Sequence, residues 1–259
     1  MDSMVCARLL DINRQFYQKF GPAFAATRRR IQPGVRRILG TLAPGGDWLD
    51  LGCGNGAVLT AWAESSEHGS YTGLDFSQAL LHEAKQRASA IRSAGLQVWL
   101  AEGNIAGGQW GDAVDALRQH DPAFPARFDS VMSFASIHHI PGSENRQAFF
   151  DRVNQALKPG GLVFLSCWQF QNSPKLVSRI QPWTLVNIDP ALLEEGDTLL
   201  DWRGTSPAQA GQTGLRYVHL FNPDELEQLS RHTGFTVVET FESDGVGSRL
   251  GLYQVWRKT

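Results

Sequence analysis

The sequence predicts an α/β fold in which helices cover both faces of a mostly parallel sheet. Short apolar runs of strand length alternate with segments whose apolar residues recur at helical spacing. Turns that contain glycine or proline separate the two kinds of segment along most of the chain. We interpret the 259 residues as one domain, because a chain of this length can form a single large core.

Two helices are predicted ahead of the sheet. In the first, Leu9, Ile12 and Phe16 fall on one helical face. Pro22 and Pro33 are expected to separate helical segments, because proline has no N–H to donate inside a helix. The predicted helices span residues 5–19 and 23–40, within an N-terminal segment of 1–42.

The core of the fold is predicted over residues 43–168. Ser77 is expected to cap one helix, because serine side chains accept hydrogen bonds from the free N–H groups of a first turn. Pro159-Gly160-Gly161 is expected to separate the last helix of this region from its last strand. The predicted strands are 47–51, 71–75, 97–102, 128–134 and 162–168, and the predicted helices are 57–64, 77–91 and 143–157.

Two long segments interrupt this alternation. Residues 106–127 are expected to contain a helix. Residues 169–215 are too long for a plain connection, so we interpret them as a lid or substrate-binding insertion. A C-terminal unit follows over residues 216–259, with a helix that starts at Asn222-Pro223 and ends at Gly234. Its two predicted strands are 236–241 and 250–256.

The composition excludes several classes of protein. No apolar run is long enough to cross a membrane, and the N-terminus lacks the apolar stretch of a secretory signal. Cys6, Cys53 and Cys167 form no CxxC pair, so they suggest neither a disulfide framework nor a zinc cage. We therefore expect a soluble, cytoplasmic protein without a bound metal.

The charges are unevenly distributed, although the formal net charge is only −2. Residues 1–40 hold eight Lys and Arg against two acids, a net charge of +6, so the remaining 219 residues carry −8. A basic segment of this kind can bind nucleic-acid phosphates, and it can equally be the solvated face of a helix.

A glycine-rich turn after the first core strand is the strongest functional signal. Residues 49–56 read LDLGCGNG, and the absence of Cβ atoms at the glycines lets a ligand approach the backbone. Dinucleotide enzymes carry G-x-G-x-x-G, whereas here an acid precedes G-x-G-x-G, which suits a ligand with an ammonium and a sulfonium. The expected contacts from this turn are Asp50, Gly52, Cys53, Gly54, Asn55 and Gly56.

The ends of the following strands supply further expected contacts. Asp75 closes the second strand where ribose-binding acids occur, and its carboxylate can accept from both ribose hydroxyls. Glu102 can accept from an adenine amino group, and Ile105 can pack on the ring. Taken alone, Asp75 could instead favour a helix dipole, and Glu102 could be a solvated loop residue. The flanking residues assigned to the same site are Phe76, Gly103, Asn104, Ser133 and Phe134.

Together these motifs resemble those of the class I S-adenosylmethionine-dependent methyltransferases. The likeness covers residues 45–168, and beside the glycine turn and the two acids it includes Phe128-Asp129-Ser130-Val131 and Leu157-Lys158-Pro159-Gly160-Gly161. It implies a Rossmann-like sheet of about seven strands with an antiparallel last strand. It also implies S-adenosylmethionine as the cofactor and S-adenosylhomocysteine as the product.

A narrower resemblance concerns the methyl acceptor. It rests on Phe16-Tyr17 with Pro22, Phe24 and Thr27-Arg28, and on Ser136-Ile137-His138-His139, Cys167-Trp168, Gln181-Pro182-Trp183 and Arg216-Tyr217-Val218-His219-Leu220-Phe221. These segments are similar to tRNA methyltransferases that esterify 5-carboxymethyluridine at the anticodon wobble position. The likeness implies tRNA as a partner and Arg28, His139 and Trp168 as catalytic residues on the substrate side. Many eukaryotic relatives also need a small zinc-binding activator subunit.

The implied chemistry agrees with these residue types. A carboxylate is ionised at neutral pH, so its methylation needs mainly alignment and exclusion of water. Arg28 can pair with a carboxylate through two hydrogen bonds, His139 can donate one, and Trp168 can stack on a splayed base. Each also has an ordinary alternative: an exposed helix residue for Arg28, a strand-end cap for His139 and a core residue for Trp168.

Two other functions stay open at this point. The acidic body and the Trp-containing insertion would also suit an enzyme that methylates a small molecule in a closed pocket. A nucleotide-binding module without catalysis is the second alternative. Residues 106–127 are longer than the matching loop of the tRNA-modifying enzymes, and 169–215 mix acids with bases, so the sequence predicts no clearly basic RNA channel.

Overall fold

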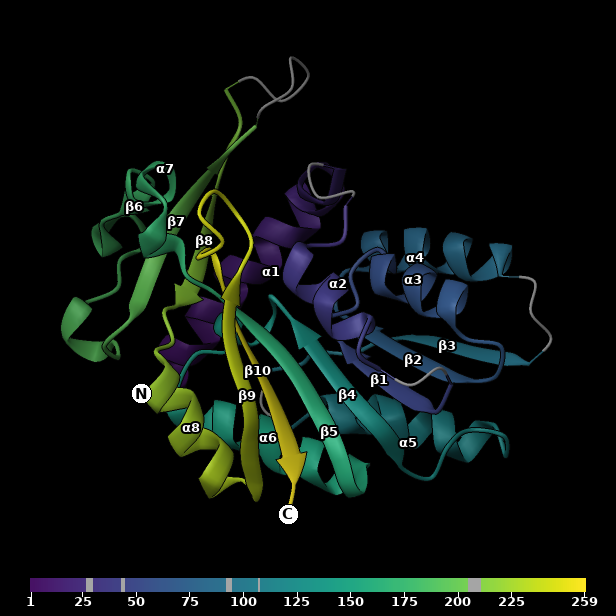
Figure 1. The fold of residues 1–259 in the computed structure, drawn as a ribbon. Helices are drawn as coiled ribbons and strands as arrows, with labels where there is room; N and C mark the ends of the chain where they lie inside the picture. Colours follow the sequence, from purple (N-terminus) through teal and green to yellow (C-terminus); the bar gives the residue numbers. More distant parts are fainter. Residues whose placement is uncertain (27–29, 43–44, 92–94, 107, 205–210) are drawn as a thin grey trace.

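A computed structural model describes the chain except for residues 27–29, 43–44, 92–94, 107 and 205–210. Its main sheet has seven strands in the order β3-β2-β1-β4-β5-β10-β9 (Figure 1). The five strands from β3 to β5 run parallel, and β10 runs antiparallel to both of its neighbours. This confirms the predicted sheet. The strands are β1 (Asp47–Leu51), β2 (Gly69–Asp75), β3 (Leu96–Glu102), β4 (Phe128–Phe134), β5 (Leu157–Trp168), β9 (Phe235–Ser243) and β10 (Gly251–Lys258).

Helices cover both faces of this sheet, as predicted (Figure 1). One face packs against α2 (Pro33–Leu39), α3 (Ala57–Ser65) and α4 (Gln78–Ala90), and the other against α5 (Trp110–His120), α6 (Ser143–Ala156) and α8 (Pro223–His232). Each face has its own apolar core, with Trp62 and Tyr71 on the first side and Phe149 and Trp256 on the second. The alternation in the sequence therefore predicts both layers correctly.

The predicted helix caps are confirmed. The Ser77 side chain accepts a hydrogen bond from the N–H of Leu80 and begins α4. Asn222 accepts from the N–H of Glu225, and Pro223 occupies the first turn of α8. These side chains satisfy N–H groups that have no partner within a helix.

The first helix differs from the prediction. The sequence predicts a break at Pro22, whereas α1 (Ser3–Ala26) runs through it as one helix. A proline inside a helix costs about 3 kcal/mol. Burial of Leu9, Phe16 and Phe20 along one stripe of α1 offsets this cost, since each such side chain contributes about 1.5–3 kcal/mol.

The start of β5 also differs from the prediction. The sequence places Pro159-Gly160-Gly161 in a turn, whereas β5 begins at Leu157, directly after α6. The strand accommodates these residues through an irregularity: Phe128 of β4 pairs with Leu157, and Ser130 pairs with Leu162. The extra residues near the start of β5 therefore form a bulge instead of a turn before the strand.

A second sheet, which the sequence did not predict, combines strands from the region interpreted as a lid with a strand that extends into the predicted C-terminal unit. It consists of β6 (Ile180–Gln181), β7 (Asp197–Arg203) and β8 (Thr213–His219), all antiparallel. Leu199 and Tyr217 of this sheet pack against Leu9 and Ile12 of α1. The short helices of the chain are α7 (Pro174–Val177) and the 3₁₀ turns Ile137–His139, Phe170–Asn172, Trp183–Val186 and Pro190–Leu192.

The N-terminal helix joins the two sheets. It contacts β8 on one side and α4 on the other, and it lies across the carboxyl edge of the main sheet (Figure 1). Within the described part of the chain, no helix combines the length and the apolar character needed to cross a bilayer.

Candidate active site

A cavity of about 690 Å³ lies at the carboxyl ends of β1 to β4. The segments that follow these four strands form one side of it, and a face of α1 forms the other. Ligands of open α/β sheets bind at this edge. The α1 residues in its lining are Ala7, Leu10, Asp11, Asn13, Arg14, Tyr17 and Gln18.

The glycine-rich turn after β1 adopts a conformation that requires glycine. Gly52 and Gly54 have φ angles of 90° and 55°, in the region that favours residues without Cβ. A Cβ on Gly52 would lie 2.2 Å from the hydroxyl oxygen of Ser136, whereas a Cβ on Gly54 would meet nothing within 4 Å. The turn therefore presents open backbone to the cavity at Gly54, which suits a bound ligand.

Asp75 connects the end of β2 to this turn. Its carboxylate accepts hydrogen bonds from the N–H groups of Gly54, at 2.9 Å, and Ser77, at 2.8 Å. Burial raises the pKa of Asp75 above its usual range, although these N–H groups favour the ionised form. The carboxylate lines the cavity and keeps lone pairs that can accept from ribose hydroxyls.

Asp50 lies behind the glycine turn instead of in the cavity lining. Its carboxylate is buried and accepts a hydrogen bond from the Tyr71 hydroxyl. Burial raises the pKa of Asp50 to about 7, the hydrogen bond from Tyr71 opposes this shift, and the charge of Asp75 adds to it. Its place in this structure is that of a support for the turn.

The end of β3 and the residues after it were expected to contact adenine. Glu102, Asn104 and Ile105 line the cavity, and the Glu102 carboxylate accepts from the side-chain amide of Gln78 at 2.9 Å. The N–H of Gly103 donates to the carbonyl of Asp75, which ties β3 to β2 at this edge. An apolar side chain beside an acid fits an adenine ring and its amino group.

Most of the residues assigned from the sequence meet in this one cavity. Those that line it are Gly52, Cys53, Gly54, Asn55, Asp75, Phe76, Glu102, Asn104, Ile105, Phe134 and His139. Among the described residues, those that lie outside its lining are Asp50, Gly56, Gly103, Ser133 and Trp168. Ser133 is buried and donates to the carbonyl of Leu51, so it holds β4 against β1. Arg28 lies outside the described residues.

His139 faces the cavity, and its Nδ1 lies 3.4 Å from the side-chain amide nitrogen of Asn13. Its Nδ1 lies 2.9 Å from the carbonyl oxygen of Tyr217, and its Nε2 lies 2.9 Å from the hydroxyl of Tyr17. Trp168 takes a different place, because its ring stacks on His138 with centroids 5.8 Å apart. The guanidinium of Arg216 also lies 4.9 Å from the centroid of the Trp168 ring.

Sequence reasoning missed the contribution of α1 to the cavity. Asn13 and Tyr17 line it, yet neither was assigned a role from the sequence. Their spacing of four residues places them on one helical face, which is the signal that could have identified them. The signal is weak, because only tertiary packing shows which face of α1 meets the sheet edge.

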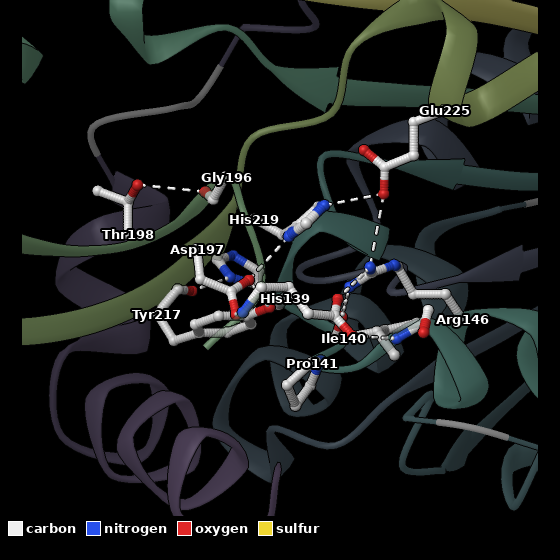
Figure 2. Close-up of polar contacts among 12 residues, drawn as sticks. His139, Ile140, Pro141, Arg146, Gly196, Asp197, Thr198, Tyr217, His219 and Glu225 are labelled. Atoms are coloured by element: carbon white, nitrogen blue, oxygen red, sulfur yellow. Dashed lines mark hydrogen bonds and ion pairs between the residues drawn. The ribbon is translucent and has the colours of Figure 1, made fainter. Parts of the chain in front are cut away.

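A buried ionic network joins the second sheet to α6 and α8 (Figure 2). His219 contacts the carboxylates of Asp197, at 2.7 Å, and Glu225, at 2.9 Å. Burial lowers the pKa of His219, but the two carboxylates outweigh it and the pKa is raised. Arg146 binds both Glu194 and Glu225.

Three members of this network lie close enough together to hold a metal ion. They are Glu194, Asp197 and His219. Both ring nitrogens of His219 already contact carboxylates, and the neighbouring Arg146 supplies a positive charge. The donor atoms are therefore engaged in hydrogen bonds and ion pairs, which suits a structural role.

Comparisons with known proteins agree with this geometry. A methyltransferase domain family matches residues 24–240. A tRNA (carboxymethyluridine(34)-5-O)-methyltransferase of Schizosaccharomyces pombe is 26% identical over 233 residues, which cover 87% of this chain and 89% of the relative. A nocamycin O-methyltransferase of Saccharothrix syringae is 31% identical over 219 residues, which cover 83% and 68%.

A solved structure shows the same fold. A SAM-dependent methyltransferase from Methanosarcina mazei superposes with a TM-score of 0.59 at 20% identity, covering 88% of this chain and 98% of the other. The open glycine turn, the Asp75 carboxylate and the apolar Ile105 beside Glu102 all fit S-adenosylmethionine. The chain belongs to the methyltransferase domain family, and it is an S-adenosylmethionine-dependent methyltransferase.

Proposed function

We propose that this enzyme methylates the carboxylate of 5-carboxymethyluridine at the wobble position of tRNA and forms the methyl ester. The observation that carries the proposal is that His139 shares one cavity with the glycine turn and Asp75. An acceptor bound beside His139 therefore lies next to the cofactor. The fission yeast relative, which bears the name of this activity, and the sequence resemblance both support this acceptor.

The reaction needs positioning more than acid or base chemistry. When bound, S-adenosylmethionine supplies a methyl group on sulfur: the acceptor oxygen forms a bond to the methyl carbon, and the electron pair of the broken C–S bond stays on sulfur. The carboxylate is already ionised at neutral pH. The protein has to hold it in line and keep water out, which is a gain in effective concentration.

The substrate-side roles assigned to Arg28 and Trp168 also belong to this proposal. Arg28 would clamp the carboxylate through two hydrogen bonds. Trp168 already stacks on His138, so we propose that it supports the turn that carries His139 instead of stacking on a base. The basic segment 1–40 would bind phosphates, and a small zinc-binding activator subunit stays a proposed partner.

Labelled S-adenosylmethionine and tRNA from cells that lack this gene test the proposal. We expect a base-labile methyl ester on the wobble uridine after digestion to nucleosides. The reaction is run with and without the activator subunit of a eukaryotic relative. Absence of label in both reactions, with cofactor binding demonstrated by titration, would contradict the tRNA acceptor.

A small-molecule acceptor is the second candidate. The observations that favour it are the relative named as a nocamycin O-methyltransferase and a cavity volume in the range of small-ligand sites. Such an enzyme would methylate its acceptor at a rate that tRNA does not inhibit. Competition by tRNA against the small acceptor would contradict this candidate.

A further inference from the structure

Arg14 of α1 supplies a positive charge on the wall of the cavity. Among the described residues that line the cavity, it is the only lysine or arginine. The acids in the same lining are Asp11, Asp75 and Glu102. An anionic group that enters the cavity therefore meets the Arg14 guanidinium as the one permanent positive charge on the described part of the wall.

Asp11 holds the guanidinium of Arg14 at this wall. The Asp11 Oδ1 accepts a hydrogen bond from Nη2 of Arg14 at 2.6 Å, three residues further along the same helix. The Asp11 Oδ2 accepts from the side-chain amide of Gln15 at 2.6 Å, and Nη1 of Arg8 lies 3.6 Å from that same oxygen. Two residues other than Arg14 therefore hold the Asp11 carboxylate, which can orient the Arg14 guanidinium.

The ion pair with Asp11 uses a small part of the hydrogen-bonding capacity of Arg14. A guanidinium carries five N–H groups in one plane, and Nη2 donates to Asp11. The Arg14 side chain is 63% exposed and lines the cavity, so a ligand there can reach it. A carboxylate can therefore accept two parallel hydrogen bonds from one edge of this guanidinium while Asp11 keeps its own.

Arg14 lies on the side of the cavity where the proposed acceptor would bind. Its neighbour Asn13 lies 3.4 Å from Nδ1 of His139, and the Tyr17 hydroxyl lies 2.9 Å from Nε2 of the same ring. Arg14 and Tyr17 are three residues apart, so they share one face of α1. A group bound to Arg14 is therefore expected near His139, whereas the expected cofactor contacts follow β1 to β3 on the other side.

We propose that Arg14 is a specificity-determining residue that binds the carboxylate of the methyl acceptor. This role rests on the proposed function, because it requires an acceptor that reacts through a carboxylate. Each carboxylate oxygen keeps lone pairs outside the two hydrogen bonds, so one oxygen can still form the bond to the methyl carbon. The electron pair of the broken C–S bond stays on sulfur. The ester product is neutral and loses its ion pair with Arg14, which favours product release.

Two RNA stem-loops that differ in one group test this role. One carries 5-carboxymethyluridine at the wobble position, and the other carries 5-carbamoylmethyluridine, in which an uncharged amide of nearly the same size replaces the carboxylate. The NH₂ of the amide only donates, as a guanidinium does, so the amide cannot accept both hydrogen bonds. Fluorescence anisotropy measures binding to enzyme saturated with S-adenosylhomocysteine. The wild type is expected to bind the carboxylate loop at least about tenfold more tightly than the amide loop.

Arg14→Gln is expected to reduce this preference to less than about threefold by weakening the binding of the carboxylate loop alone. Arg14→Lys keeps the charge but loses the planar pair of donors, and it is expected to restore part of the preference. If Arg14→Gln weakened both loops by the same factor, Arg14 would act on RNA phosphates, and the proposal would be overturned.

Arg8→Gln is the matched control. Arg8 also belongs to α1 and pairs with Asp11, but it lies outside the cavity lining. This variant loses one positive charge from the same helix, and we expect it to keep the wild-type preference even if both loops bind more weakly. Loss of the preference in Arg8→Gln would mean that the overall charge of α1 is responsible, which contradicts a specific role for Arg14.

Titration with S-adenosylhomocysteine alone separates the carboxylate of the acceptor from that of the cofactor. The amino-acid part of the cofactor carries a carboxylate of its own, which is the competing anion in this cavity. We expect Arg14→Gln to bind S-adenosylhomocysteine with the dissociation constant of the wild type. A loss of this affinity would place Arg14 at the cofactor and overturn its assignment to the acceptor.

The same experiments distinguish a failure of the Arg14 assignment from a failure of the proposed function. If the wild type methylates the carboxylate loop while Arg14→Gln keeps the binding preference, the proposed function stands and Arg14 is not the ligand. Loss of the preference in Arg28→Gln but not in Arg14→Gln leads to the same conclusion. If the wild type neither binds nor methylates the carboxylate loop, the proposed function fails, and the Arg14 assignment fails with it.

Discussion

Asp75 shows how one side chain can organise a cofactor site. Its carboxylate receives N–H groups from the glycine turn and from the start of α4, so it fixes two segments that come from different strands. The same carboxylate faces the cavity, where the ribose would bind. A substitution to alanine would therefore remove both the hydrogen bonds that join these segments and the proposed ribose contact.

We expect Asp75→Ala to weaken S-adenosylhomocysteine binding at least about tenfold, because hydrogen bonds to a charged group each contribute about 1.5–3 kcal/mol. Calorimetric titration measures the loss. Asp224→Ala removes an exposed acid from the first turn of α8 and should leave the dissociation constant unchanged. An unchanged affinity in Asp75→Ala would remove the ribose assignment.

Asp50 should make the stability of the protein depend on pH. Its folded pKa of about 7 lies above the usual value of 3.8, so its contribution is fully present at low pH and is lost as the pH rises through about 7. Asp50→Asn keeps an acceptor for the Tyr71 hydroxyl but cannot ionise. Urea unfolding is therefore expected to show that the free energy of unfolding of Asp50→Asn, relative to that of the wild type, is higher at pH 8 than at pH 5. An equal difference at the two pH values would contradict this.

The sequence predicts the strand-end side of the cavity better than the α1 side. Gly54, Asp75 and Ile105 follow strands whose order in a parallel sheet brings their ends together, so local patterns suffice to group them. Tyr17 precedes the first strand of the sheet by many residues and reaches the cavity only because α1 packs between β8 and α4. No local sequence pattern predicts how α1 packs.

At the scale of elements, the buried ionic network holds the second sheet in place. Arg146 of α6 binds Glu194, which precedes β7, and Glu225 of α8. The Arg146 side chain is 4% exposed, so water cannot take the place of its guanidinium beside the two carboxylates. The network thereby fixes β8, which carries Arg216 and the carbonyl that binds His139.

Arg146→Met should destabilise the fold by about 3 kcal/mol, because it removes a buried cation and leaves the partly buried carboxylates of Glu194 and Glu225 without it. Chemical unfolding provides the value. The control is Arg231→Met on α8, whose exposed ion pair with Glu227 should contribute less than about 1 kcal/mol. If both variants unfolded at the same denaturant concentration, the network would have no structural role.

Elements were predictable where periodicity and turn residues agreed. The strand after the N-terminal helices and the caps at Ser77 and Asn222 follow from local rules. The second sheet escaped prediction because part of the apolar surface that its strands pack against belongs to α1, which is distant in the sequence. The helix break at Pro22 was predicted wrongly because tertiary burial outweighed the local preference of proline. The turn at residues 159–161 was predicted wrongly because strand pairing outweighed the local preference of proline and glycine.

At the scale of the whole molecule, a basic N-terminal region is joined to an acidic body. Arg14 lies on the cavity wall, and Arg36 is an exposed residue of α2. RNA bound there should release counterions as its phosphates are neutralised. The positive charge of residues 1–40 would therefore favour an RNA acceptor.

If tRNA binds this region, its affinity should fall steeply with salt. The logarithm of the association constant is expected to decrease by about 0.7 for each decade of salt and each contacted phosphate of a single strand. Arg36→Gln should reduce this slope. Arg249→Gln should not, because its exposed side chain pairs with Glu242 and lies outside the basic segment 1–40. A slope near zero would favour the small-molecule acceptor.

A crystal structure of the enzyme with S-adenosylhomocysteine and no other ligand tests the central claim most directly. We expect the ribose hydroxyls to bind Asp75, the adenine to lie beside Ile105 and the sulfur to face Tyr17 and His139 across the cavity. A ribose away from Asp75, or a sulfur that faces away from Tyr17 and His139, would contradict it.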